Sequence, residues 1–191
     1  MSDGDKRRQD LVQLGAKHPD PNVRDLFERF LPTEQRTERL GEVVDLKKIL
    51  TLKGNIARGR ELFLEAGVQC RSCHRVHGTG IALGPELDEI GKKYDRAQLL
   101  ESIVEPSKKI DPKYMAFLAT TTEGKAYTGL LVERTPKGIL LKTARNETIR
   151  LATSEIEDLE PQEKSFMPDQ MLRDLTARDA ADLLAYLGSL K

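Results

Sequence analysis

The stretch "VQCRSCHRVHG", Val68 to Gly78, contains both cysteines of the chain and two of its three histidines. Two thiols and an imidazole at this spacing suit three chemistries: covalent attachment of haem, a structural zinc ion, and a redox-active dithiol. The fold depends on which of these applies, because each requires a different arrangement of helices and strands around the cysteines.

The order Cys70, Arg71, Ser72, Cys73, His74 has the C-x-x-C-H spacing of covalent haem attachment. In that chemistry the two thiols add to the two vinyl groups of the porphyrin. The adjacent histidine is thereby placed under the iron as its proximal ligand. We therefore predict one haem c, bound through Cys70 and Cys73, with His74 as an iron ligand.

The zinc site and the redox dithiol each require residues or secondary structure that the sequence does not clearly supply. A structural zinc ion takes four ligands, and beyond Cys70, Cys73 and His77 only His18 or a distant carboxylate could complete the set. A thioredoxin-like dithiol follows a strand and opens a helix in a βαβ unit. These cysteines instead follow a predicted helix and precede a Gly-rich loop. Haem is favoured, and the other two chemistries stay open at this point.

The charge balance limits the classes of partner. Lys plus Arg and Asp plus Glu each number 31 in the 191 residues, which removes any general electrostatic reason to bind nucleic acid or an anionic membrane surface. No apolar run approaches the roughly 20 residues of a membrane-spanning helix, and "MSDGDKRRQD" lacks the apolar stretch of a signal peptide. We expect no nucleic-acid partner and no membrane span, in a protein that is either cytoplasmic or a trimmed piece of a longer chain.

The hydrophobic period divides the chain into regions. Residues 1–53 read as an N-terminal helical extension of short, charged amphipathic helices. Residues 54–111 are again helical, interrupted by the cysteine cluster and a Gly-rich loop. Residues 164–191 return to helix, with Thr176 and Asp179 as a candidate capping box.

Between residues 112 and 163 the period falls to two. Four strands are predicted there, "YMAFLATTT", "AYTGLLVERT", "GILLKTA" and "TIRLA", joined by short turns. Two-stranded pieces are not stable alone, so the strands are expected to form one antiparallel meander, curled into a small barrel or sandwich. With helices on either side of it, this all-β insert makes the predicted fold class α+β.

Four features of the helical regions occur in order: Gly59 and Phe63 on one helix, the C-x-x-C-H motif, "LGPEL", and a last helix with Leu183 and Tyr186. A glycine lets two helix backbones approach closely while aromatic rings fill the flanks, so we expect the first and last of these helices to pack together. The set resembles a class I cytochrome c. The resemblance implies an all-α class I cytochrome c fold built discontinuously from 54–111 and 164–191.

The same resemblance implies how His74 and the iron are completed. The backbone carbonyl of Pro85 in "LGPEL" matches the position that accepts the outward ring N–H of the histidine. Met167 in "SFMPDQMLRDLT" lies a short loop before the last helix, where class I cytochromes c carry their methionine ligand. Met171 is its competitor, and Met115 is assigned to the core. The implied metal ligands are therefore His74 and Met167.

A longer pattern is similar to one more specific family. "GKKYDRAQLLESIVEPSKKI", the strand meander and "SFMP" resemble the planctomycete-type haem-binding domain at the C-terminus of large secreted proteins, from about Gly54 onward. The resemblance implies an extracytoplasmic location, periplasmic or equivalent, with the signal peptide absent from this chain. It also implies a fused dehydrogenase domain or a separate redox partner protein.

The function expected from these observations is one-electron transfer by a c-type cytochrome domain, an electron carrier and not an enzyme. A haem-based gas or redox sensor, in which the methionine is displaced, is the alternative. A zinc-binding adaptor is less favoured. The sequence identifies neither the electron donor and acceptor nor the oligomeric state.

Overall fold

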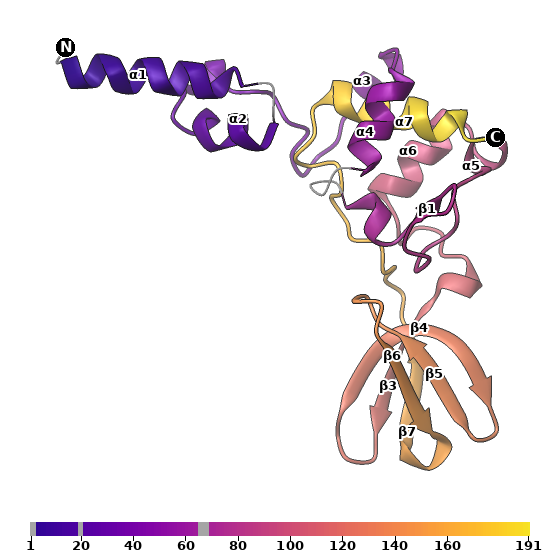
Figure 1. The fold of residues 1–191 in the computed structure, drawn as a ribbon. Coiled ribbons are helices and arrows are strands. Elements are labelled where there is room, and N and C mark those ends of the chain that lie inside the picture. The colour runs from indigo at the N-terminus through magenta and orange to yellow at the C-terminus, as the bar shows by residue number, and fades with distance from the viewer. Residues whose placement is uncertain (1–2, 19–20, 65–68) are drawn as a thin grey trace. The chain divides into compact units, whose positions relative to one another are not determined.

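The computed structural model describes residues 3–18, 21–64 and 69–191. The chain forms two compact units, Met1–Arg39 and Leu40–Lys191, shown along the chain in Figure 1. Within the described residues, no helix combines the length and the apolar composition that spanning a membrane requires.

The first unit pairs helix α1 (Asp3–Ala16) with α2 (Pro21–Glu28) and continues into the 3-10 turn η1 (Thr33–Gln35). At the end of α2 the Glu28 carboxylate accepts the Thr37 backbone N–H and lies 2.9 Å from the Arg39 guanidinium. Burial alone would raise the pKa of Glu28, but the hydrogen bonds from Thr37 and Arg39 outweigh it and lower that pKa to about 2. The carboxylate therefore stays charged at neutral pH and holds the end of α2 to the segment that follows.

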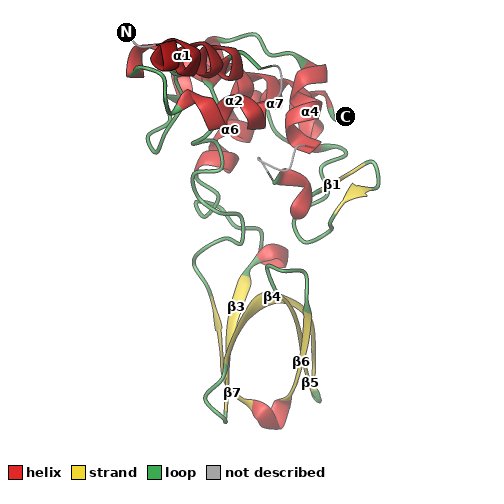
Figure 2. Cartoon of the chain, turned by 60° about the vertical axis from the view of Figure 1, so that its left-hand side comes forward, coloured by secondary structure: helices red, strands yellow, loops and turns green. Residues whose placement is uncertain are grey.

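The second unit combines helices with two antiparallel sheets, coloured by type in Figure 2. The mixed α+β class predicted from the sequence is confirmed. Its helical elements are α3 (Leu46–Thr51), η2 (Cys70–Ser72), α4 (Ile56–Leu64), α5 (Ile90–Lys93), α6 (Arg96–Val104), η3 (Pro112–Tyr114), η4 (Thr153–Glu155) and α7 (Ala177–Ser189). A two-stranded ribbon, β1 (Arg75–Val76) and β2 (Thr79–Gly80), lies among them in sequence.

The larger sheet has five strands in the described residues 69–191, in the order β6-β5-β4-β3-β7. The strands are β3 (Ala116–Thr121), β4 (Ala126–Thr135), β5 (Gly138–Lys142), β6 (Thr148–Ala152) and β7 (Ile156–Pro161). All neighbours are antiparallel, and the sheet curls on itself (Figure 2). Ala119, Ile139, Leu141 and Leu151 form its buried core.

The prediction of four strands was wrong in number, because β7 was not recognised. Its sequence, "IEDLEP", is rich in acids and carries its apolar residues, Ile156 and Leu159, three positions apart. A register shift between Thr120 and Thr121 of the partner strand accommodates that spacing, and such an irregularity hides the period of two. Because β7 pairs with β3, at Phe117 and Pro161 among other positions, the insert begins and ends on adjacent strands.

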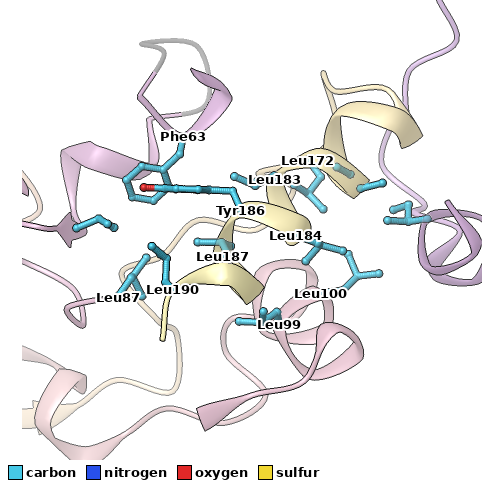
Figure 3. Close-up of a cluster of buried hydrophobic side chains, with 14 residues drawn as sticks. Phe63, Leu87, Leu99, Leu100, Leu172, Leu183, Leu184, Tyr186, Leu187 and Leu190 are labelled. Carbon is cyan, nitrogen blue, oxygen red and sulfur yellow. The ribbon is translucent and has the colours of Figure 1, made fainter. Parts of the chain in front are cut away.

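The helical part of this unit packs around α7. Its Leu183, Leu184 and Leu187 are almost fully buried, and Figure 3 shows the α7 side chains between Phe63 on one side and Leu99 and Leu100 of α6 on the other. The capping box predicted at the start of α7 is confirmed: the Thr176 hydroxyl accepts the Asp179 N–H, and the Asp179 carboxylate accepts the Thr176 N–H, both at 3.1 Å.

The expected contact between the helices of Gly59 and Tyr186 is confirmed. A Cβ added at Gly59 would lie 2.0 Å from the backbone oxygen of Asp182, so α4 and α7 meet closer than any side chain at this position allows. The Phe63 and Tyr186 rings pack beside this point with centroids 5.7 Å apart and planes tilted by 56°. The buried Asp182 carboxylate accepts the Asn55 N–H at 2.7 Å, which fixes the start of α4 against α7.

We predict that Gly59→Ala destabilises the protein by about 1–3 kcal/mol, because the methyl group must push α4 away from a backbone oxygen. Gly188→Ala is the matched control. It is also a helical glycine, and among the described residues no heavy atom lies within 4 Å of the added Cβ, apart from neighbours in its own helix. The control should be neutral or stabilising by up to about 1 kcal/mol. Urea unfolding measures both, and equal stabilities of the two variants would contradict the prediction.

Candidate functional site

The cysteine cluster forms a single tight turn after α4. Gln69 adopts a left-handed conformation with φ of 55°, which turns the chain into η2. The N–H groups of Cys73 and His74 both donate to the Cys70 carbonyl oxygen, at 3.2 and 2.9 Å. Cys70, Cys73 and His74 are therefore held as one rigid group, and both cysteines are thiols of intermediate exposure that form no disulfide. Val68 of the motif lies outside the described residues.

The loop that follows folds back over this turn. Ile81 N–H donates to the Arg71 carbonyl at 3.0 Å, and the N–H groups of Leu83 and Gly84 donate to the Cys73 carbonyl at 3.0 and 2.7 Å. Gly80 makes the return possible, since its φ is +109° and a Cβ there would lie 2.2 Å from the His74 oxygen. The backbone of residues 80–84 thus closes around the cluster through main-chain hydrogen bonds.

The His74 ring is oriented by the same loop. Its Nδ1 lies 2.8 Å from the backbone carbonyl oxygen of Pro85. A carbonyl oxygen can only accept, so Nδ1 carries the proton and Nε2 keeps its lone pair. Gly84 packs against the ring, where a Cβ would come within 2.8 Å of Cε1. The arrangement presents Nε2 as the ligating atom of a neutral imidazole.

The pKa shifts of this group favour uncharged side chains. Burial lowers the pKa of His74, and the Pro85 hydrogen bond offsets only part of that effect. Burial raises the pKa of Cys70 to about 11, with Cys73 adding to the rise, and burial also raises the pKa of Cys73. Neutral imidazole is the form that ligates a metal, whereas a redox dithiol needs an accessible thiolate. Thiols that become thioethers have no such requirement.

The residues that the zinc alternative requires do not form a metal site. His77 sits at the turn between β1 and β2 with φ of 46°, its side chain 71% exposed, and its backbone N–H donates to the Asp88 carboxylate at 2.6 Å. Among the described residues, no three His, Cys, Asp or Glu side chains are grouped so that they could hold a metal ion. His77 is thus a surface turn residue.

The methionines lie elsewhere in the chain. Met167 is half-buried in the loop between β7 and α7, where its N–H donates to the Ser165 hydroxyl at 3.1 Å. Met171 lines a pocket of about 90 Å³ together with Val44, Val104 and Leu172. Met115, which the sequence placed inside a strand and in the core, is half-buried and caps η3 just before β3. The hydrogen bonds that gather Cys70, Cys73, His74 and Pro85 do not include Met167.

These residues fit a covalently attached haem. Two thiols on one turn, an adjacent imidazole with Nε2 unprotonated, and a carbonyl that fixes the ring supply both attachment points and one axial ligand. The glycine at 84 keeps the space beside the ring free of a side chain. Such a site would hold the group through Cys70, Cys73 and His74.

The comparison with known families agrees with this chemistry. The cytochrome c family model matches residues 56–131. The match contains α4, the C-x-x-C-H turn, Pro85, α5 and α6, and it ends within β4. A cytochrome c domain implies covalent haem and supports electron transfer, and such domains are usually extracytoplasmic. No curated protein matches the chain.

Sequence reasoning missed the contribution of the glycines around the cluster and of two serines near Met167. The sequence shows Gly80 and Gly84 only as part of a Gly-rich loop, and their spacing after the motif is the one signal it offers. Ser107 and Ser165, which hold the loop of Met167, carry no pattern at all.

We predict that Gly84→Ala lowers the free energy of unfolding by about 1–3 kcal/mol, because the new Cβ displaces the His74 ring from its hydrogen bond to Pro85. Gly188→Ala is again the control, as a glycine with open space around it. Urea unfolding of both variants measures the difference, and a stability of Gly84→Ala equal to that of the wild type would show that the ring is not held as described.

Proposed function

We propose that this chain is an electron-transferring c-type cytochrome with one haem, bound through Cys70 and Cys73 and ligated by His74 and Met167. The observation that carries the proposal is the 2.8 Å contact between His74 Nδ1 and the Pro85 carbonyl, directly beside two thiols on one turn. When bound, the haem supplies an iron that cycles between the ferrous and ferric states. No substrate bond is formed or broken, so the proposed protein is a carrier and not an enzyme.

Each residue has a defined task in this proposal. Cys70 and Cys73 hold the group covalently, so that it cannot dissociate. Pro85 keeps the proton of His74 on Nδ1 and makes Nε2 a better donor to a metal. Met167 would supply a soft thioether, which raises the reduction potential of a haem iron. Support for Met167 comes from its loop position before α7 and its partial burial.

The proposal also assigns the domains. Residues 54–111 and 164–191 would form a discontinuous class I cytochrome c domain, 112–163 its β insert, and 1–53 a helical extension. The close packing of α4 on α7 supports a domain assembled from both ends of this range, and the pairing of β3 with β7 supports an insert whose ends meet. We further propose an extracytoplasmic location and a dehydrogenase, fused or separate, as the redox partner.

The haem is tested by producing the chain in a host compartment that attaches haem c. We expect a Soret band that survives acid-acetone extraction, with one haem per chain. The double variant Cys70→Ala, Cys73→Ala should lose the Soret band that survives extraction. His77→Ala should keep that band, because His77 is exposed and is a ligand only in the zinc alternative. Zinc without haem in the purified protein would contradict the proposal.

The sixth ligand is tested by three methionine variants. Met167→Ala should lower the reduction potential by about 0.2 V, within the roughly 0.8 V range that axial ligands cover, and remove the spectral signature of methionine ligation. Met171→Ala and Met115→Ala are matched controls and should change the potential little. Potentiometric titration with spectra of both redox states decides the matter. A change in Met171→Ala alone would reassign the ligand, and tight carbon monoxide binding by the wild type would favour the sensor alternative.

A further inference from the structure

The two ends of the β insert are tied together twice. At the sheet, β3 pairs with β7, and the Gln162 N–H donates to the Ala116 carbonyl at 2.8 Å. Beyond the sheet, the Ser165 N–H donates to the hydroxyl of Ser107 at 3.1 Å, across 58 residues of sequence. Ser107 follows the buried Pro106 just after α6, so the second tie connects the returning chain to the end of that helix.

The second tie continues into the loop of Met167. The Ser165 hydroxyl accepts the Met167 N–H at 3.1 Å, two residues further along. A serine that accepts from the N–H two positions later fixes the backbone between them in a turn. The chain of contacts therefore runs from the Ser107 hydroxyl through Ser165 to the main chain of Met167, and all three residues are half-buried.

The other anchors of this loop lie on the far side of Met167. Leu172 is almost fully buried, with 2% of its surface exposed, and the Leu40 N–H donates to the Leu175 carbonyl at 2.8 Å. Between Ser165 and Leu172 the loop contains no helix or strand. The position of Met167 is thus set on one side by the Ser107–Ser165 pair and on the other by the packed start of the α7 region.

We propose that Ser107 and Ser165 are positioning residues for the sixth ligand, which hold the Met167 loop in place through their hydroxyl oxygens. This inference rests on the proposed function, since it takes Met167 as the ligand. In this role the two serines act through the main chain of Met167 and not on the haem itself. They lower the freedom of the loop, so that an external ligand must displace a methionine held close to its site rather than one on a mobile segment.

The test uses the full chain with haem attached, in the ferric state, titrated with imidazole. Ser107→Ala removes the acceptor of the Ser165 N–H, and Ser165→Ala removes the acceptor of the Met167 N–H. Each loss of one hydrogen bond should make imidazole bind about fivefold more tightly, because the competing methionine is held less firmly. Ser107→Thr keeps the hydroxyl and should restore wild-type affinity.

Two controls separate positioning from general loss of stability. Ser102→Ala removes another serine hydroxyl, which donates to the Gln98 carbonyl at 2.8 Å on the same helix α6, and should leave imidazole affinity unchanged. In a Met167→Ala background, Ser107→Ala should add nothing, because no methionine competes. A wild-type affinity in both serine variants, or an equal gain in the Met167→Ala background, would overturn the inference.

The outcomes also distinguish this inference from the proposed function. If Met167→Ala leaves the spectrum and the potential unchanged, Met167 is not the ligand and the proposed ligation fails. If Met167→Ala changes both and the serine variants change nothing, the ligation stands and only the positioning role is wrong.

Discussion

The contact of α4 with α7 at Gly59 is the constraint on which the second unit depends. An added Cβ would lie 2.0 Å from the Asp182 oxygen, so the two backbones touch with no side chain between them. Phe63 and Tyr186 fill the space beside this contact, and the Asp182 carboxylate caps the start of α4. The helical core therefore has one fixed crossing, and the remaining leucines pack around it.

The cysteine turn and the loop of Met167 each adjoin one of the two helices of that crossing. The chain enters the cysteine turn a few residues after α4, and the loop of Met167 leads into α7. Holding the two helices in register thus fixes where the cysteine turn and the loop of Met167 begin. The final orientation of His74 is local, because it depends on Gly84 and the Pro85 carbonyl rather than on distant packing. The helix crossing therefore sets where the cysteine turn lies, whereas the orientation of the His74 ring is set by its own loop.

Local patterns predicted much of this structure. The helical periodicity, the capping box at Thr176 and the role of Gly59 depend on residues a few positions apart, which a single sequence displays. Strand β7 does not show in the sequence, because a register shift in its pairing with β3 breaks its own period of two. The Ser107–Ser165 bond could not be foreseen, because its partners lie 58 residues apart and an isolated serine carries no signal. The spacing of residues in the sequence indicates local geometry, whereas hydrogen bonds between the two ends of an insert are seen only in the folded structure.

The meeting of the insert's two ends also bears on the order in which the chain folds. Asn55 and Asp182, which hydrogen-bond at the helix crossing, are separated by 127 residues, and closing so long a loop carries an entropic cost. The pairs β3–β4, β4–β5 and β5–β6 join strands that follow one another in the sequence and can form early from short-range contacts, after which β7 pairs with β3. Once β3 and β7 are paired, the whole insert spans little distance, so the effective loop between the two helices is much shorter. The β insert adds residues between α4 and α7, but once folded it lowers the entropic cost of bringing Asn55 and Asp182 together.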